Sequence, residues 1–92
     1  MTLIKMGSKL LKKEILNRLC YTDLVYERIN KKLNLSIERD KIQSLVKLLI
    51  KEAPGENIKK IGKNYYILNL SKNVRITVNS SSFRVITVDR IV

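Results

Sequence analysis

Residues 58–91, IKKIGKNYYILNLSKNVRITVNSSSFRVITVDRI, decide the fold that the sequence predicts. Runs of β-branched and aromatic residues alternate there with turn-forming Gly, Asn and Ser, which is typical of short strands joined by tight turns. The expected strands cover residues 58–61, 65–70, 74–79 and 83–91. In the third run apolar and polar residues alternate, as in an antiparallel strand with one buried face. The last run is apolar on both faces, so we expect it inside the sheet or covered by helices.

Three helices are expected before the sheet. Residues 1–7 are predicted to be a loose start, and Ser8 is a candidate N-cap for a helix over 9–20. Thr22 and Ser36 are candidate caps for helices that run to Leu33 and over 37–53. The third helix has the clearest apolar periodicity, and Pro54-Gly55 ends it.

Together these elements predict a single α+β domain over residues 1–92. Its helical part occupies residues 8–53 and a four-stranded antiparallel β-meander occupies 56–92, with the three helices packed on one face. A chain of 92 residues buries enough surface for one modest core.

The charge of the chain is the strongest global signal. Lys and Arg number 19 against 8 Asp and Glu, a formal net charge of +11. Such a field favours polyanions, although a Lys-, Asn- and Ile-rich composition also accompanies AT-rich genomes. The expected partners are nucleic acid, with RNA favoured over DNA, or an acidic protein. No apolar run approaches the ~20 residues that span a bilayer, and no signal peptide is evident, so we expect no membrane contact and a cytoplasmic location.

Residues typical of catalytic and metal sites are scarce. The chain has no His and one Cys, so Cys20 is expected to be a small buried hydrophobe where the first helix ends. The serines at 80–82 are expected to form a turn rather than to supply a nucleophile. We therefore assign no catalytic residue, metal or cofactor, and the sequence favours a protein that is not an enzyme.

The candidate binding surface is the polar face of the sheet. Tyr65 and Tyr66 are adjacent on a strand and point to opposite faces, so one is expected in the core and the other on the surface as a base-stacking platform. The rest of the candidate surface is cationic or polar and is expected to contact phosphate. The predicted nucleic-acid-binding residues are Lys63, Tyr65, Arg75, Thr77, Asn79, Arg84 and Arg90. The alternative reading is a solvated face whose charges deter edge pairing.

Several short motifs resemble a family of small bacterial proteins of unknown function. The family runs a Gly-Lys-Asn-aromatic hairpin into an Ile-Thr-Val-Asn strand and a terminal Ile-Thr strand. The resemblance covers about residues 20–91, and the matching segments are 21–22, 27–29, 33–35, 62–66, 76–79 and 86–87. The family pattern places His after the Asn and after the last Thr, where this chain has Ser81 and either Val88 or Asp89. Chemistry that depended on those His residues is therefore not expected here.

Three alternative functions remain open. The order of helices and sheet is similar to that of RelE and barnase-like ribonuclease toxins, which implies a small endoribonuclease. A module that binds an acidic protein is the second alternative. The third is a winged-helix DNA-binding protein, although Glu38 and Asp40 stand in the first turn of its recognition helix, where phosphate would repel them.

Overall fold

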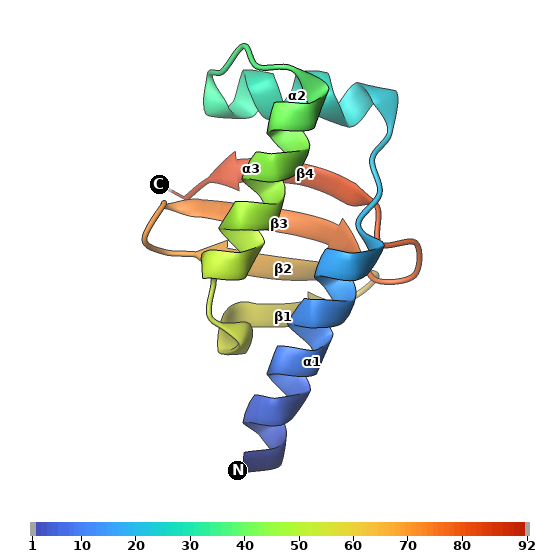
Figure 1. The fold of residues 1–92 in the computed structure, drawn as a ribbon, viewed down its shortest axis with the longest axis vertical. Helices are drawn as coiled ribbons and strands as arrows, with labels where there is room; N and C mark the ends of the chain where they lie inside the picture. The colour runs from blue at the N-terminus through green and yellow to red at the C-terminus, as the bar shows by residue number, and fades with distance from the viewer. Residues whose placement is uncertain (1, 92) are drawn as a thin grey trace.

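The computed structural model describes residues 2–91 and the side chains of residues 9–91. The fold contains a four-stranded antiparallel sheet with the strand order β1-β2-β3-β4 (Figure 1). The α+β meander predicted from the sequence is thus confirmed. The strands are β1 (Ile58–Ile61), β2 (Asn64–Asn69), β3 (Val74–Asn79) and β4 (Val85–Arg90).

Three α-helices precede the sheet and lie over one of its faces, as predicted (Figure 1). α3 runs over the strands, α1 packs against α3 and η1 and extends past the β1 edge of the sheet, and α2 packs along β4. None of the helices in the described part of the chain is long and apolar enough to cross a membrane. The helices are α1 (Thr2–Arg18), α2 (Asp23–Leu33) and α3 (Arg39–Glu52), and a short 3₁₀ turn, η1 (Gly55–Asn57), follows them.

The first helix corrects the predicted start of the chain. It begins at Thr2, so residues 2–7 are helical and Ser8 lies inside the helix instead of capping it. Gly7 costs a helix only about 1 kcal/mol and does not stop it. The helix ends at Arg18, and Cys20 is exposed rather than buried.

Two other boundaries differ from the prediction for local reasons. The N-cap of α3 is Glu38, not Ser36, and Thr22 occupies the N-cap of α2 without a side-chain hydrogen bond. The last strand begins at Val85 rather than Phe83, because Phe83 has a φ of 58° and cannot continue an extended strand.

The core lies between the helix layer and the sheet. Its fully buried members are mostly β-branched residues that face each other across this interface. Burial of such side chains stabilises the fold by about 1.5–3 kcal/mol each. The residues with no exposed surface are Ile15, Ile29, Ile42, Val46, Ile50, Ala53, Ile67, Ile76, Val78 and Val88.

β4 is an edge strand, so the expectation of an interior position is wrong. The alternative expectation, that helices cover this strand, is correct, because α2 packs against β4. Arg28 of α2 donates a hydrogen bond of 3.2 Å to the carbonyl of Ile86. The helix therefore shields an edge that would otherwise be open to pairing with another chain.

Two polar contacts fasten the helices to the rest of the fold. The link between α1 and α2 pairs with the sheet through Cys20, whose N–H donates to the Phe83 carbonyl at 3.0 Å and whose carbonyl accepts from the Val85 N–H at 2.9 Å. The Lys12 ammonium donates hydrogen bonds to the carbonyl of Lys51 and, at 2.7 Å, to the carbonyl of Ala53. This cation satisfies carbonyls at the C-terminal end of α3 and interacts favourably with its dipole.

Candidate nucleic-acid interface

The face of the sheet opposite the helices is uncovered in the described part of the chain. The strand register places Lys59, Tyr66, Thr77 and Thr87 side by side across the four strands on this face. We call it the open face. Its residues belong to the positions that alternate with the buried Ile67 and Ile76.

A hollow of about 420 Å³ lies on the open face, over β1, β2 and β3. Apolar side chains line it together with one aromatic ring and two cations, and one of the apolar side chains, Ile61, is 64% exposed. The Arg75 guanidinium lies 5.7 Å from the centre of the Tyr66 ring, within the range of a cation–π contact. The lining residues are Lys59, Ile61, Tyr66, Leu68 and Arg75.

Arg75 is only weakly neutralised by its acidic neighbour. Asp89 lies opposite Arg75 on β4, with 3.8 Å between the carboxylate oxygen and the guanidinium nitrogen. The nearer partner of Asp89 is Lys32 of α2, at 3.2 Å. Because one carboxylate is shared between two cations, this cluster keeps a net positive charge that a phosphate can contact.

The structure gathers only part of the predicted site on this face. Arg75 and Thr77 lie on it, but Thr77 is only 4% exposed and offers little surface to a ligand. Its neighbours on the flanking strands are Tyr66 and Thr87. A short threonine beside a tyrosine is easily covered, which alternation alone does not reveal.

Tyr65 was the wrong tyrosine for the exposed position. It is packed against the core, with its ring 6.2 Å from that of Phe83 and its strand partner Val78 fully buried. Tyr66 takes the place on the open face that the sequence had assigned to Tyr65. The general expectation of one tyrosine on each face is confirmed.

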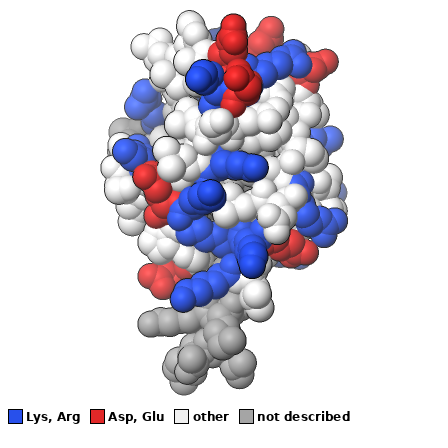
Figure 2. All heavy atoms as spheres, in the orientation of Figure 1, with Lys and Arg blue, Asp and Glu red and all other residues white. Residues whose placement is uncertain are grey.

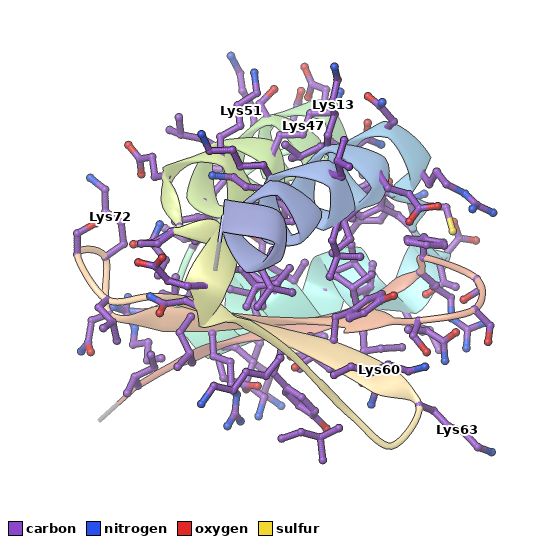
Figure 3. The ribbon with its side chains drawn as sticks, turned by 90° about the horizontal axis from the view of Figure 1, so that it is seen from below. Lys13, Lys47, Lys51, Lys60, Lys63 and Lys72 are labelled. Carbon is purple, nitrogen blue, oxygen red and sulfur yellow. The ribbon has the colours of Figure 1, made fainter. Side chains whose placement is uncertain are left out.

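The other predicted residues lie around the ends of the sheet. Lys63 is at the tip of the β1–β2 hairpin and points into solvent (Figure 3). Asn79 accepts hydrogen bonds of 2.9 Å from the N–H groups of Ser81 and Ser82, so its side chain shapes the β3–β4 turn.

The two arginines expected beside Arg75 do not join it. Arg84 is exposed next to Cys20, and Arg90 donates a hydrogen bond of 2.8 Å to the Leu33 carbonyl at the end of α2. Sequence reasoning also missed Lys59, which needed the strand register to be placed beside Tyr66.

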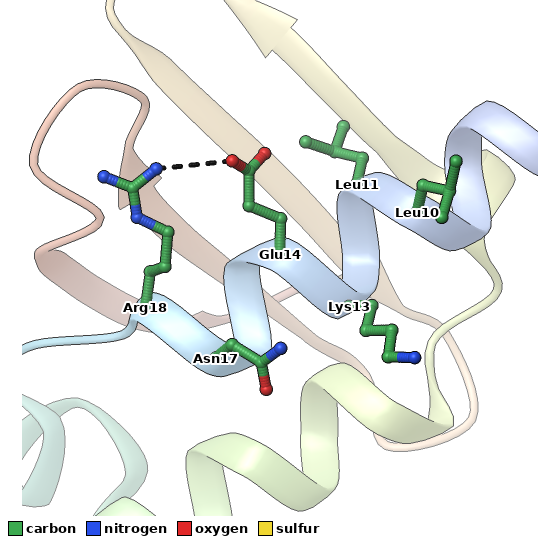
Figure 4. A pocket seen from close by; sticks show the side chains of 6 residues that line it. All are labelled: Leu10, Leu11, Lys13, Glu14, Asn17 and Arg18. Carbon is green, nitrogen blue, oxygen red and sulfur yellow. Dashed lines mark hydrogen bonds and ion pairs between the residues drawn. The ribbon is translucent and has the colours of Figure 1, made fainter.

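A second hollow, of about 600 Å³, runs along α1 (Figure 4). All of its lining residues come from this one helix, so it is an open groove without groups that converge from different elements. Arg18 is paired with Glu14 at 3.3 Å within it. We therefore locate the candidate site on the open face. The groove is lined by Leu10, Leu11, Lys13, Glu14, Asn17 and Arg18.

Tyr21 has a perturbed pKa, away from the open face. Burial, together with smaller contributions from the neighbouring Tyr26 and Cys20, raises the pKa of the Tyr21 phenol from 10.0 to about 12. The ring stacks on that of Tyr26 with centroids 5.5 Å apart, and the buried hydroxyl has no hydrogen-bond partner among the described residues. Tyr21 therefore contributes to packing through its ring rather than its hydroxyl.

The Tyr21→Phe variant is expected to become relatively more stable than the wild type as the pH rises above 10. The folded-state pKa of about 12 exceeds the unfolded value of 10.0, so the unfolded chain loses this proton at a lower pH than the folded protein does. The wild type therefore loses stability as the pH rises from 10 to 12, whereas the variant has no phenol at this position to titrate. Urea unfolding of both proteins at pH 8, 10 and 11 measures the difference. A difference that stays constant across this range would contradict the assignment.

The comparisons with known proteins add a family to this description. No curated protein and no solved structure matches the chain. The family described as "Protein of unknown function (DUF3781)" has a model that matches residues 13–89, which include most of the helices and the whole hollow on the open face. The chain thus belongs to the DUF3781 family, a family of proteins of unknown function.

Proposed function

We propose that the protein binds single-stranded nucleic acid, RNA in preference to DNA, on the open face of its sheet. The observation that carries this proposal is the position of the Tyr66 ring between Lys59 and Arg75 in the hollow on that face. A base stacked on an aromatic ring contributes about 1–3 kcal/mol, and flanking cations contact its phosphates. The hollow has an aromatic ring for stacking a base and two cations for contacting phosphates.

The uncovered sheet and the charge of this surface also support a single strand over a duplex. An uncovered antiparallel sheet with an aromatic ring can stack bases that are splayed out of a helix, as they are in single-stranded RNA segments. The net charge of +11 raises the rate of encounter with any polyanion. Specific contact then depends on Tyr66, and general attraction on the charge.

Fluorescence anisotropy with short single-stranded RNA, single-stranded DNA and duplex DNA across a salt series tests the proposal. We expect RNA to bind most tightly, and Tyr66→Leu to weaken that binding about tenfold through lost stacking. Lys59→Gln and Arg75→Gln should each reduce the log–log salt slope by about 0.7, the value for one phosphate contact on a single strand.

Lys60→Gln is the matched control. Lys60 follows Lys59 on β1 and is also exposed, but it pairs with Tyr65 and so belongs to the opposite face. Both substitutions remove one charge from the same strand. Equal weakening by both would show that only overall charge matters and would overturn the proposed site.

The same experiment separates the alternatives. Shortening of the RNA during the assay would identify an endoribonuclease, and tightest binding to duplex DNA would favour the winged-helix hypothesis. Absence of RNA binding together with a salt-insensitive complex with an acidic protein would favour the protein-interaction module.

A further inference from the structure

A cluster of three lysines lies on the outer surface of the helix layer. Lys13 of α1 and Lys47 and Lys51 of α3 are exposed and gather on the side of these helices that faces away from the sheet (Figure 3). Lys and Arg side chains also concentrate over α1 and α3 in the space-filling view (Figure 2). We call these three residues the helix-face cluster.

The packing of α1 on α3 holds this cluster together. The Lys12 ammonium bonds to the carbonyl of Lys51, which brings the adjacent Lys13 beside the C-terminal end of α3. Lys47 precedes Lys51 by four residues and therefore lies one turn away on the same side of the helix. Lys12 itself is occupied with the end of α3, so the cluster consists of its three neighbours.

The lysines of the helix-face cluster, Lys13, Lys47 and Lys51, form no ion pairs among the described side chains. Glu14, the acidic residue next to Lys13, is engaged with Arg18. Three like charges on one surface repel one another, and a bound phosphate chain relieves that repulsion.

We propose that the helix-face cluster is a second phosphate-binding surface, so that one molecule holds two RNA segments on opposite sides of its sheet. This inference rests on the proposed function of the open face. The cluster has no aromatic side chain in it, so it contacts the backbone of the RNA and not its bases. A protein with two such faces bridges strands and brings them together for pairing.

Energy transfer between two labelled RNAs tests the bridging. The probes are six-nucleotide adenylates, short enough to occupy one site on a single-strand-binding face of about 4–16 nucleotides, and carry either a donor or an acceptor dye. We expect the wild type to produce energy transfer at one protein per two RNAs. The variant Lys13→Gln, Lys47→Gln, Lys51→Gln should lose most of this transfer, and its binding of a single RNA, read by anisotropy, should change by less than about threefold.

The matched control removes three charges elsewhere: Lys31→Gln, Lys41→Gln, Lys72→Gln. These lysines are exposed and lie on α2, on α3 and in the β2–β3 turn. The salt slope of bridging should fall by about 2 in the helix-face variant, for three phosphates at about 0.7 each. Equal loss of transfer in both triple variants would overturn the inference, as would transfer that persists in the helix-face variant.

Failure of the two proposals is distinguishable in these measurements. A wild type that binds one RNA without energy transfer overturns the bridging alone and leaves the open face in place. A wild type that binds no RNA in the anisotropy assay overturns both.

Discussion

Replacing Phe83 with alanine is expected to lower the free energy of unfolding by about 3–5 kcal/mol, because the substitution removes a large aromatic side chain from a packed site. Phe83 is 5% exposed, and its ring lies 4.3 Å below the Arg18 guanidinium and beside Tyr65. Its carbonyl also accepts the N–H of Cys20, which ties the link between α1 and α2 to the sheet. Loss of the ring therefore loosens the point where the helices join the β3–β4 turn.

Replacing Phe83 with glycine is expected to cost about 1 kcal/mol less than alanine does. Phe83 has a φ of 58°, in the left-handed region, where residues with a Cβ cost about 1–2 kcal/mol and glycine does not. The order of stability should be Phe, then Gly, then Ala, the reverse of the usual order of the two small residues.

Urea unfolding of the three proteins measures this order, with equal m-values as the sign that the same surface is exposed on unfolding. Asn73, with a φ of 58° in the exposed β2–β3 turn, offers a control without the packing term. Asn73→Gly should be neutral or slightly stabilising, and Asn73→Ala should be destabilising by about 1 kcal/mol. If the Phe83→Ala variant is more stable than the Phe83→Gly variant, the left-handed backbone at residue 83 does not strain residues that carry a Cβ.

The sheet was predictable because its signals are local. Period-two alternation over 74–79 and the turn residues between the strands specify an antiparallel meander without reference to the helices. The position of β4 was not predictable in the same way. An interior strand and an edge strand covered by α2 both need two apolar faces, so only the tertiary packing distinguishes them.

The candidate site was harder to predict than the fold because it depends on register. Tyr65 and Tyr66 are identical in kind, and a shift of one residue exchanges their faces. The β1–β2 hairpin fixes the pairing of Lys59 with Tyr66, and it turns at Gly62 with a φ of 62°. The sequence shows the turn but not which tyrosine it turns toward the helices.

Asn69 illustrates what composition and periodicity do not reveal. It is a polar residue in β2 that is 1% exposed, on the face covered by the helices. Its amide nitrogen donates to the Leu49 carbonyl of α3 at 2.9 Å, and its oxygen accepts from the Ser71 hydroxyl and the Lys72 N–H at 3.0 Å each. One side chain therefore joins a helix to the β2–β3 turn.

Asn69→Ala is accordingly expected to destabilise the protein by about 2–4 kcal/mol, because the buried Leu49 carbonyl and the Lys72 N–H lose their partner. For a domain of this size the thermal midpoint should fall by about 10–25 °C. Asn57→Ala is the control, since Asn57 is half-buried and its amide donates only one long hydrogen bond of 3.4 Å, to the Leu68 carbonyl. That variant should lose less than about 1 kcal/mol.

The Asn69→Asp variant distinguishes the effect of losing the hydrogen-bond donor of this side chain from the effect of changing its packing. The aspartate keeps an oxygen for Ser71 and Lys72 but presents a second oxygen to the Leu49 carbonyl, so at pH 7 the variant should be at least as unstable as Asn69→Ala. Burial raises the pKa of such a carboxyl above its usual value of about 3.9, and its protonated form can donate to Leu49. The stability of Asn69→Asp relative to the wild type should therefore recover as the pH falls from 7 to about 4, because the folded state then takes up a proton before the unfolded state does. Recovery in urea unfolding at pH 4–5 would assign the effect to the lost hydrogen-bond donor, whereas a deficit independent of pH would show that the amide acts through packing alone.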